Sequence, residues 1–170
     1  MFQQQKHKMI KIKPLSNYPG QVSNLSNMWR VNIGEAFSPS VSSDIIASKL
    51  QESLNEDSLP LAFIALDGDN PVGMVRLSIE ADIGHSPYFP WINMLFIDQR
   101  YRKRGIGALL LKSIQSEAFR LGFKKLYAAP LSDESHAWLI KKAGWGEVEG
   151  AKIEAVDKIL TYNLSHADLI

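Results

Sequence analysis

Hydrophobic and polar residues recur along this chain in two periods, one typical of strands and the other of helices. Residues 9–15, MIKIKPL, alternate at every second position and predict a first strand. Apolar positions at helical spacing follow. They predict one helix over residues 19–33 that ends at Gly34, and a second helix over residues 38–54. Two apolar runs then flank residues 67–70, DGDN, a strong turn signal that predicts a β-hairpin.

The segment 90–98, PWINMLFID, is apolar at both parities and predicts a strand with two buried faces. Its apolar side chains divide by parity into Trp91, Leu95 and Ile97 on one face and Ile92, Met94 and Phe96 on the other. A strand of this kind belongs in the middle of a sheet that is covered on both sides.

Helix and strand patterns alternate in the rest of the chain. Apolar residues at helical spacing predict a helix over residues 106–121, and KKLYAAPL predicts a strand over residues 124–131. A capped helix is predicted over residues 132–144. A last strand is predicted over residues 154–164, paired antiparallel after a turn near Gly150.

The order of these elements predicts an α/β fold with a mixed central sheet. We expect about six to seven strands flanked by about four helices, with residues 90–131 as a β-α-β unit whose strands are parallel. The chain has 170 residues, 45% of them hydrophobic, and no segment reads as a linker. A single domain over residues 1–170 is therefore expected.

Composition excludes several kinds of chemistry. The chain has no cysteine, which excludes disulfides, thiolate metal sites and cysteine nucleophiles. The formal net charge is only +1, so there is no global reason to expect a nucleic acid or an anionic membrane as partner. No apolar run nears the ~18 residues that span a bilayer, and the first residues lack the apolar core of a signal peptide. We therefore expect a cytoplasmic protein.

Positive charge is concentrated in residues 98–113, DQRYRKRGIGALLLKS, where four of the five residues from Arg100 to Arg104 are basic. A helix N-terminus presents unpaired N–H groups and roughly half a positive charge, and glycines let the backbone approach a ligand closely. Together they predict a phosphate-binding turn. Two familiar motifs are excluded, because the dinucleotide fingerprint fails at Leu110 and the P-loop pattern fails at Leu111.

The pattern that does fit is R-x-x-G-x-G, residues 102–107, directly after a buried strand that ends in LFID. It resembles the acetyl-CoA signature of the Gcn5-related N-acetyltransferase (GNAT) superfamily, Q/R-x-x-G-x-G/A. The later KKAGW, residues 141–145, is similar to the Gly-Phe close of that family, and the resemblance covers roughly residues 61–145. The alternative interpretation is a solvated basic turn with helix-capping glycines.

The resemblance implies a GNAT-like fold that uses acetyl-CoA as co-substrate. It assigns the pyrophosphate to the backbone N–H groups of Arg102, Lys103, Arg104, Gly105, Ile106, Gly107 and Ala108. It assigns the pantetheine arm to the strand residues Leu95, Phe96 and Ile97, and Asp133 stands where the family often has an asparagine that contacts this arm. No two histidines have the spacing of metal ligands, so no metal is expected.

For the reaction, the resemblance implies that a primary amine attacks acetyl-CoA directly in a ternary complex. The tyrosine that many members use as general acid is replaced by Ile140. Candidate acids and bases are the residues in or beside the loop that precedes the buried strand, namely Glu80, Asp82, His85 and Tyr88, and Asn93 is a polar residue within that strand that would line the acetyl site. We expect Glu80, His85 and Asn93 to be catalytic. The simpler alternatives are a solvated loop residue for His85 and a structural hydrogen bond for Asn93.

One wall of the acceptor pocket in this family corresponds to residues 29–40 here. The expected substrate contacts are Trp29, Glu35, Phe37 and Tyr88. The acceptor would be a small-molecule or peptide amine, with no nucleic acid or membrane as partner. Dimers are frequent in the family, so a homodimer is one option, and the sequence leaves the oligomeric state open. Two other functions stay open. A non-catalytic acyl-CoA sensor is favoured by the missing tyrosine, and a nucleic-acid surface is disfavoured by the near-neutral charge.

Overall fold

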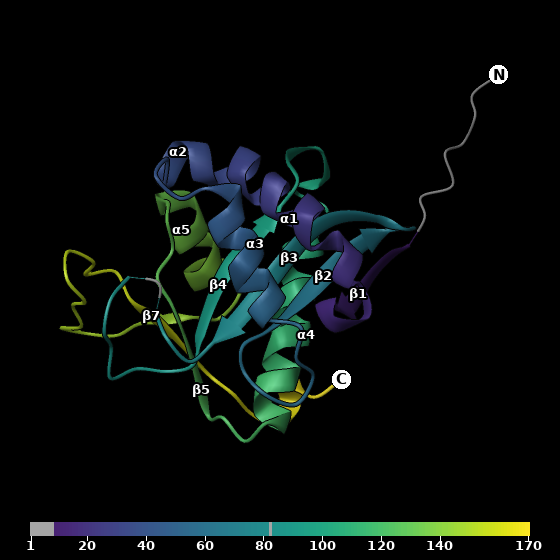
Figure 1. Cartoon of the computed structure of the whole chain (residues 1–170). Helices are drawn as coiled ribbons and strands as arrows, with labels where there is room; N and C mark the ends of the chain where they lie inside the picture. The colour runs from purple at the N-terminus through teal and green to yellow at the C-terminus, as the bar shows by residue number, and fades with distance from the viewer. Residues whose placement is uncertain (1–8, 82) are drawn as a thin grey trace.

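One mixed sheet organises the part of the chain that the computed structural model describes, residues 9–81 and 83–170 (Figure 1). Its seven strands have the order β1-β2-β3-β4-β5-β7-β6. All neighbouring strands are antiparallel except β4 and β5, which are parallel. The strands are β1 (Ile10–Pro14), β2 (Leu61–Asp67), β3 (Asn70–Ser78), β4 (Trp91–Ile97), β5 (Lys125–Ala128), β6 (Gly146–Glu147) and β7 (Leu160–Asn163). The predicted mixed α/β fold, the hairpin and the parallel β-α-β unit are confirmed.

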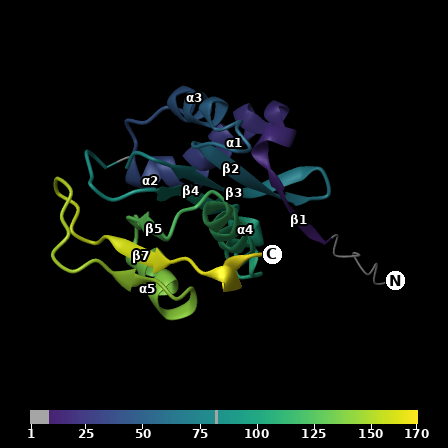
Figure 2. The same ribbon diagram turned by 90° about the horizontal axis from the view of Figure 1, so that it is seen from below.

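Helices cover both faces of this sheet. They are α1 (Val22–Trp29), the short α2 (Glu35–Phe37), α3 (Ser43–Glu52), α4 (Ile106–Arg120) and α5 (Asp133–Lys142). Figure 2 shows α1 and α3 on one side of the sheet and α4 and α5 on the other. No described helix is both long enough and apolar enough to cross a membrane.

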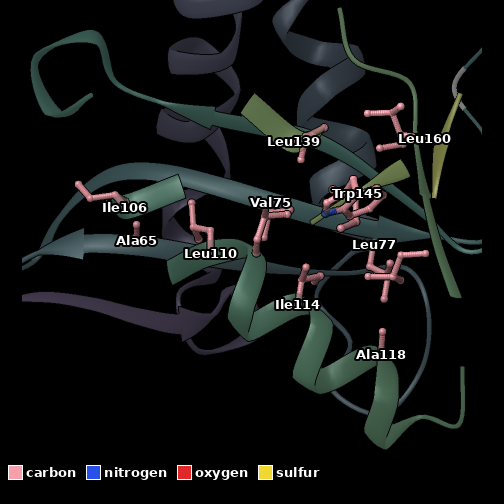
Figure 3. Close-up of a cluster of buried hydrophobic side chains, with 14 of the residues drawn as sticks. Ala65, Val75, Leu77, Ile106, Leu110, Ile114, Ala118, Leu139, Trp145 and Leu160 are labelled. Carbon is pink, nitrogen blue, oxygen red and sulfur yellow. The ribbon is translucent and has the colours of Figure 1, made fainter. Parts of the chain in front are cut away.

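Each face of the sheet has its own core. On the α4 side, Ile106, Leu110, Ile114 and Ala118 recur every four residues and pack against the strands (Figure 3). On the other side, residues of α1 and α3 pack against β2, β3 and β4. Because both faces are covered, the middle strands are apolar on both sides, as predicted for β4.

The side chains of β4 do not alternate as its sequence predicts. Met94 has a φ of 52°, and the register beside it shifts, so that two residues of β4 oppose one residue of β3. Across this β-bulge, Ile92, Leu95 and Ile97 pack on the α4 side, and Met94 and Phe96 pack on the α1 side. The prediction that put Ile92 on the same face as Met94 is wrong, because an inserted residue reverses the parity of the strand.

β4 and β5 share a single pair of residues, Trp91 and Tyr127. The Tyr127 N–H donates a hydrogen bond to the Pro90 carbonyl oxygen at this junction, across 3.0 Å. Beyond it, β4 continues to Ile97 without a further pair in β5. In the part of the chain that the structure describes, one edge of the second half of β4 is therefore left without a neighbouring strand.

The sequence predicts that the first helix ends at Gly34, but in the structure the helical chain continues past this residue. A π-helical turn, Arg30–Gly34, continues α1 directly into α2. A Cβ at Gly34 would lie 2.6 Å from the ring atom Cζ3 of Trp29, so this glycine makes room for the indole instead of reversing the chain. The second helix begins later than predicted, with Ser42 as its N-cap.

Candidate functional site

The chain between β4 and α4 forms a tight turn that leads into the N-terminus of α4. A 3₁₀ turn, Gln99–Tyr101, follows β4 directly. Gly105, the N-cap residue of α4, has a φ of 78°, a left-handed conformation that favours glycine. No atom of residues 9–81 or 83–170 lies within 4 Å of the position that its Cβ would take. Space beside this residue is therefore open.

No side chain of the described residues caps the N-terminus of α4. By contrast, α3 and α5 begin with Ser42 and Ser132, whose hydroxyl oxygens accept hydrogen bonds from the first helical turn. The first N–H groups of a helix have no acceptor within it, and in α4 they belong to Ile106, Gly107 and Ala108. Among residues 9–81 and 83–170, no group accepts from them. Three free donors at the positive end of a helix dipole suit a phosphate.

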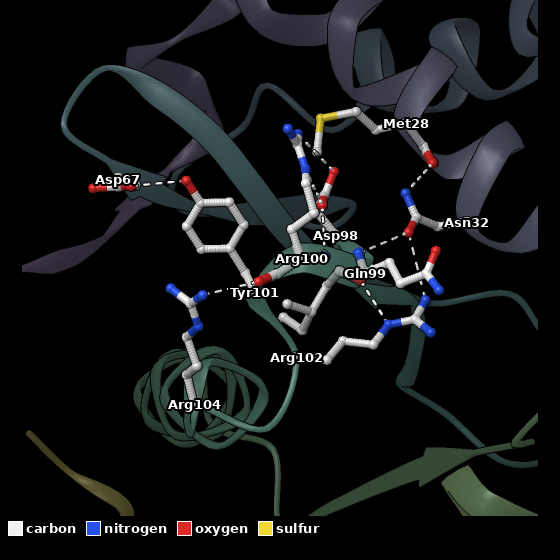
Figure 4. Close-up of polar contacts among 10 residues, drawn as sticks. Met28, Asn32, Asp67, Asp98, Gln99, Arg100, Tyr101, Arg102 and Arg104 are labelled. Atoms are coloured by element: carbon white, nitrogen blue, oxygen red, sulfur yellow. Dashed lines mark hydrogen bonds and ion pairs between the residues drawn. The ribbon is translucent and has the colours of Figure 1, made fainter. Parts of the chain in front are cut away.

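The side chains of Arg102 and Arg104 are held by carbonyl oxygens of β4 and of the turn (Figure 4). Arg102 Nε donates to the Ile97 carbonyl oxygen, and Arg104 Nη2 donates to the Arg100 carbonyl oxygen, each across 3.0 Å. The Arg104 guanidinium also lies 5.0 Å from the centroid of the Tyr101 ring. These side chains donate to carbonyl oxygens and so brace the backbone of the turn. The N–H groups at the start of α4 take no part in these bonds and stay available to an anion.

Two carboxylates fix the ends of the same turn. Asp98 Oδ1 accepts from the backbone N–H of Arg100 at 3.0 Å and from its Nε at 3.1 Å, and the bond from the side chain lowers the pKa of Asp98. The Tyr101 hydroxyl donates to Asp67 Oδ2 at 2.8 Å, and this bond raises the pKa of Tyr101. Asp98 thus stays ionised and Tyr101 neutral at neutral pH, and the turn keeps both bonds.

The residues predicted to contact a pantetheine arm lie on the part of β4 that lacks a pair in β5. Phe96 is buried among the residues under α1, so a ligand can reach only its backbone. Leu95 and Ile97 are half-buried on the α4 side. An unpaired strand edge binds extended ligands through its backbone N–H and carbonyl groups.

Two positions on α5 differ from the family pattern, and both have structural partners here. Asp133 is exposed in the first turn, where Lys158 Nζ lies 3.1 Å from its Oδ1. Ile140 is half-buried and packs against the core under α4. Neither residue places a hydroxyl or an amide near the predicted site.

The predicted catalytic residues occupy two different settings. Glu80 and His85 are exposed in the loop between β3 and β4, and Asp82 lies outside the described residues. Asn93 is half-buried in β4, where its Nδ2 donates to Ser78 Oγ at 2.9 Å and its Oδ1 accepts from Arg76 at 3.4 Å. These bonds support the structural alternative for Asn93, and the catalytic roles stay predictions.

Arg76 was not among the predicted site residues, although it is buried at 5% exposure beside the β4 bulge. Its Nε donates to Ser53 Oγ at 2.8 Å, and the Ser53 hydroxyl donates to the Lys49 carbonyl oxygen at 2.6 Å. Together with Asn93, these residues tie the C-terminus of α3 to β3 and β4. The signal in the sequence was a single charge within the apolar run VGMVRLS.

The predicted acceptor contacts divide into buried and accessible residues. Trp29 is only 6% exposed, so its ring belongs to the core under α1. Glu35 and Phe37 are exposed on α2. A hollow beside them is lined by Arg30, Gly34, Glu35, Pro39 and Val41.

Tyr88 lies elsewhere, at the junction of β4 and β5. Its ring is 5.1 Å from that of Tyr127, which in turn lies 5.9 Å from the ring of Trp91. These residues form a small cluster with the loop before β7, which contributes Ala151, Ile153 and Ile159. Among the described residues, no group of acidic or histidine side chains could hold a metal ion.

The model of the acetyltransferase (GNAT) family matches residues 27–145 of this chain. None of the curated proteins with which it was compared matches significantly.

Several solved structures share the fold at low identity. A GNAT-family acetyltransferase from Staphylococcus aureus Mu50 is 15% identical with a TM-score of 0.67, covering 92% of this chain and 100% of its own. An aminoglycoside 6'-N-acetyltransferase complexed with coenzyme A is 18% identical with a TM-score of 0.65, covering 91% and 97%. The PaiA N-acetyltransferase of Thermoplasma acidophilum in complex with coenzyme A is 17% identical with a TM-score of 0.67, covering 91% and 99%.

Proposed function

We propose that this chain, which belongs to the GNAT family of acetyltransferases, transfers the acetyl group of acetyl-CoA to a primary amine. The observation that carries the proposal is the uncapped N-terminus of α4 beside the unpaired edge of β4. Two structures with the same fold, the aminoglycoside enzyme and the Thermoplasma enzyme, contain coenzyme A.

The residues of the turn fit the phosphates of coenzyme A. The N–H groups of Ile106, Gly107 and Ala108 would donate to the pyrophosphate, and the open space at Gly105 admits it close to the backbone. The amides of the pantetheine arm would pair with the edge of β4 between Leu95 and Ile97. When bound, acetyl-CoA supplies an activated thioester at the end of this arm.

The chain itself would hold the amine and acetyl-CoA in position and supply polar groups to the reaction. An amine must be neutral to attack a thioester, and without cysteine the chain cannot form an acyl-cysteine intermediate. Direct attack in a ternary complex is therefore proposed. The bulge at Met94 takes backbone groups of β4 out of regular pairing, and we expect one such N–H to donate to the acetyl oxygen. Since Ile140 cannot donate a proton, Glu80 and His85 are the candidates to move one.

Calorimetric titration with acetyl-CoA and with CoA tests the cofactor half of the proposal. We expect saturable binding with one site per chain. Absence of binding at millimolar ligand would contradict both the proposed enzyme and any acyl-CoA-binding role.

The catalytic half is tested by a screen of amines, in which the release of CoA from acetyl-CoA is measured with and without each amine. The second candidate function is a non-catalytic acyl-CoA sensor, favoured by Ile140 at the position of the usual acid. Tight acetyl-CoA binding without CoA release across small-molecule, polyamine and peptide amines would support the sensor over the enzyme.

A further inference from the structure

One side chain of the π-helical turn contacts the turn that leads into α4. Asn32 Oδ1 accepts a hydrogen bond from the backbone N–H of Gln99 at 3.2 Å, and Arg102 Nη2 lies at 3.5 Å from the same oxygen. Asn32 Nδ2 donates to the Met28 carbonyl oxygen at 2.9 Å. Figure 4 shows the amide between these groups. Both ends of the amide have partners, so its orientation is fixed.

The two segments that Asn32 joins are far apart in sequence and carry different parts of the proposed site. Gln99 begins the 3₁₀ turn, and Arg102 begins the R-x-x-G-x-G pattern while bracing the end of β4 through Ile97. On the other side, Arg30, Gly34 and Glu35 of the same helical segment line the hollow beside α2. π-Helical turns within α-helices frequently occur at functional sites.

We propose that Asn32 is a positioning residue that couples occupancy of the acyl-CoA turn to the order of residues 30–37. The inference rests on the proposed function, since it takes the turn as the CoA site and the hollow as part of the acceptor wall. A ligand that fixes the N–H groups of the turn also restricts Gln99 and Arg102. Through Asn32 this restriction reaches the π-helical turn, so the wall is ordered before the acceptor binds.

Hydrogen–deuterium exchange with coenzyme A as the ligand tests this coupling without knowledge of the acceptor. In the wild-type chain, saturating CoA should slow exchange in peptides covering residues 99–108 and also in peptides covering residues 30–37, by about fivefold or more. In Asn32→Ala, protection should remain over residues 99–108 and disappear over residues 30–37. Asn24→Ala is the matched control, because Asn24 lies on α1 and its side chain donates to the nearby Gln21.

Asn32→Asp separates the two ends of the amide. An aspartate keeps an oxygen that can accept from Gln99 and Arg102, but its second oxygen faces the Met28 carbonyl oxygen in place of a donor, so CoA-dependent protection of residues 30–37 should fall less than in Asn32→Ala. Survival of full protection in Asn32→Ala would overturn the coupling. Failure of CoA to protect residues 99–108 in the wild type would instead refute the proposed cofactor site, which keeps the two failures distinct.

Discussion

Trp91 Nε1 donates a hydrogen bond to the carbonyl oxygen of Tyr88 across 2.7 Å, which fastens the loop before β4 to the strand itself. Trp145 is as fully buried, at 3% exposure against 2% for Trp91, yet its Nε1 has no partner within the described residues. The two tryptophans are similarly buried, but only the Trp91 indole N–H has a hydrogen-bond acceptor among the described residues. An unsatisfied buried donor costs about 1–3 kcal/mol relative to a paired one.

Replacement of each tryptophan by phenylalanine should separate these environments. Trp91→Phe loses both packing and a hydrogen bond, and we expect the free energy of unfolding to fall by about 2–4 kcal/mol. Trp145→Phe loses similar packing but also removes the unpaired donor, so its net effect should stay within about 1 kcal/mol. Urea unfolding of both variants measures the difference, and equal losses would contradict this account of the Trp145 indole.

Gly34→Ala tests the packing of Trp29 under the π-helical turn. The added methyl would lie 2.6 Å from the ring of a buried tryptophan, so the ring or the helix must move. We expect a loss of about 1–3 kcal/mol in the free energy of unfolding. Gly20→Ala is the matched control, because no described residue has an atom within 4 Å of its added methyl. That variant should be neutral or slightly stabilised, and similar losses at both sites would show that Gly34 is not required by packing.

The sequence predicts elements well where local pattern controls structure, and less well where packing controls it. The stripe from Ile106 to Ala118 identifies α4 because its period is that of a helix. The bulge at Met94 is invisible to the same reasoning, because one inserted residue changes no composition and reverses every later side chain. Gly34 reads as a helix stop, but it is helical here, and its lack of a side chain makes room for the Trp29 ring, a neighbour that only the folded chain reveals.

The candidate site shows the same division. The glycine turn is a local pattern, so the sequence predicts its position between a strand and a helix, and the structure confirms this position between β4 and α4. Asn32 and Gln99 are 67 residues apart, and nothing in either segment alone indicates that they meet. The arginines of the turn carry the charge that marks the site, yet Arg102 and Arg104 donate to nearby carbonyl oxygens, a pairing that charge pattern does not specify.

Alkaline pH should destabilise the fold through Tyr162. Its hydroxyl donates to Asp168 Oδ1 at 2.7 Å, and burial together with this bond raises the pKa of Tyr162 to about 12. An unfolded tyrosine loses its proton near pH 10, so between about pH 10 and 12 the native state binds more protons than the unfolded state. The free energy of unfolding should therefore fall as the pH rises through this window, by on the order of 2 kcal/mol.

Tyr162→Phe should be less stable than wild type at neutral pH, because Asp168 loses a donor, and it should show a shallower decline above about pH 10. Tyr18→Phe serves as the control for the loss of a hydroxyl from a half-buried tyrosine in another part of the chain. Urea unfolding at a series of alkaline pH values measures both. An unchanged slope in Tyr162→Phe would assign the alkaline decline to other groups.

Gly107 is the position where fold and ligand make different demands. A Cβ there would lie 3.4 Å from Cη2 of Trp138, at the close limit of van der Waals contact, so the fold accepts a Cβ at this position. A carboxylate in the first turn of α4 also interacts favourably with the helix dipole, and the melting temperature of Gly107→Glu should not fall. The same carboxylate would repel a phosphate at the N–H groups of α4, so CoA affinity should drop by about 100-fold or more.

Gly20→Glu adds the same charge at an open site away from the turn and should bind CoA as the wild type does. Equal calorimetric affinity of the two glutamate variants for CoA would exclude the N-terminus of α4 as the phosphate site, because the added charge would then have the same effect at both positions.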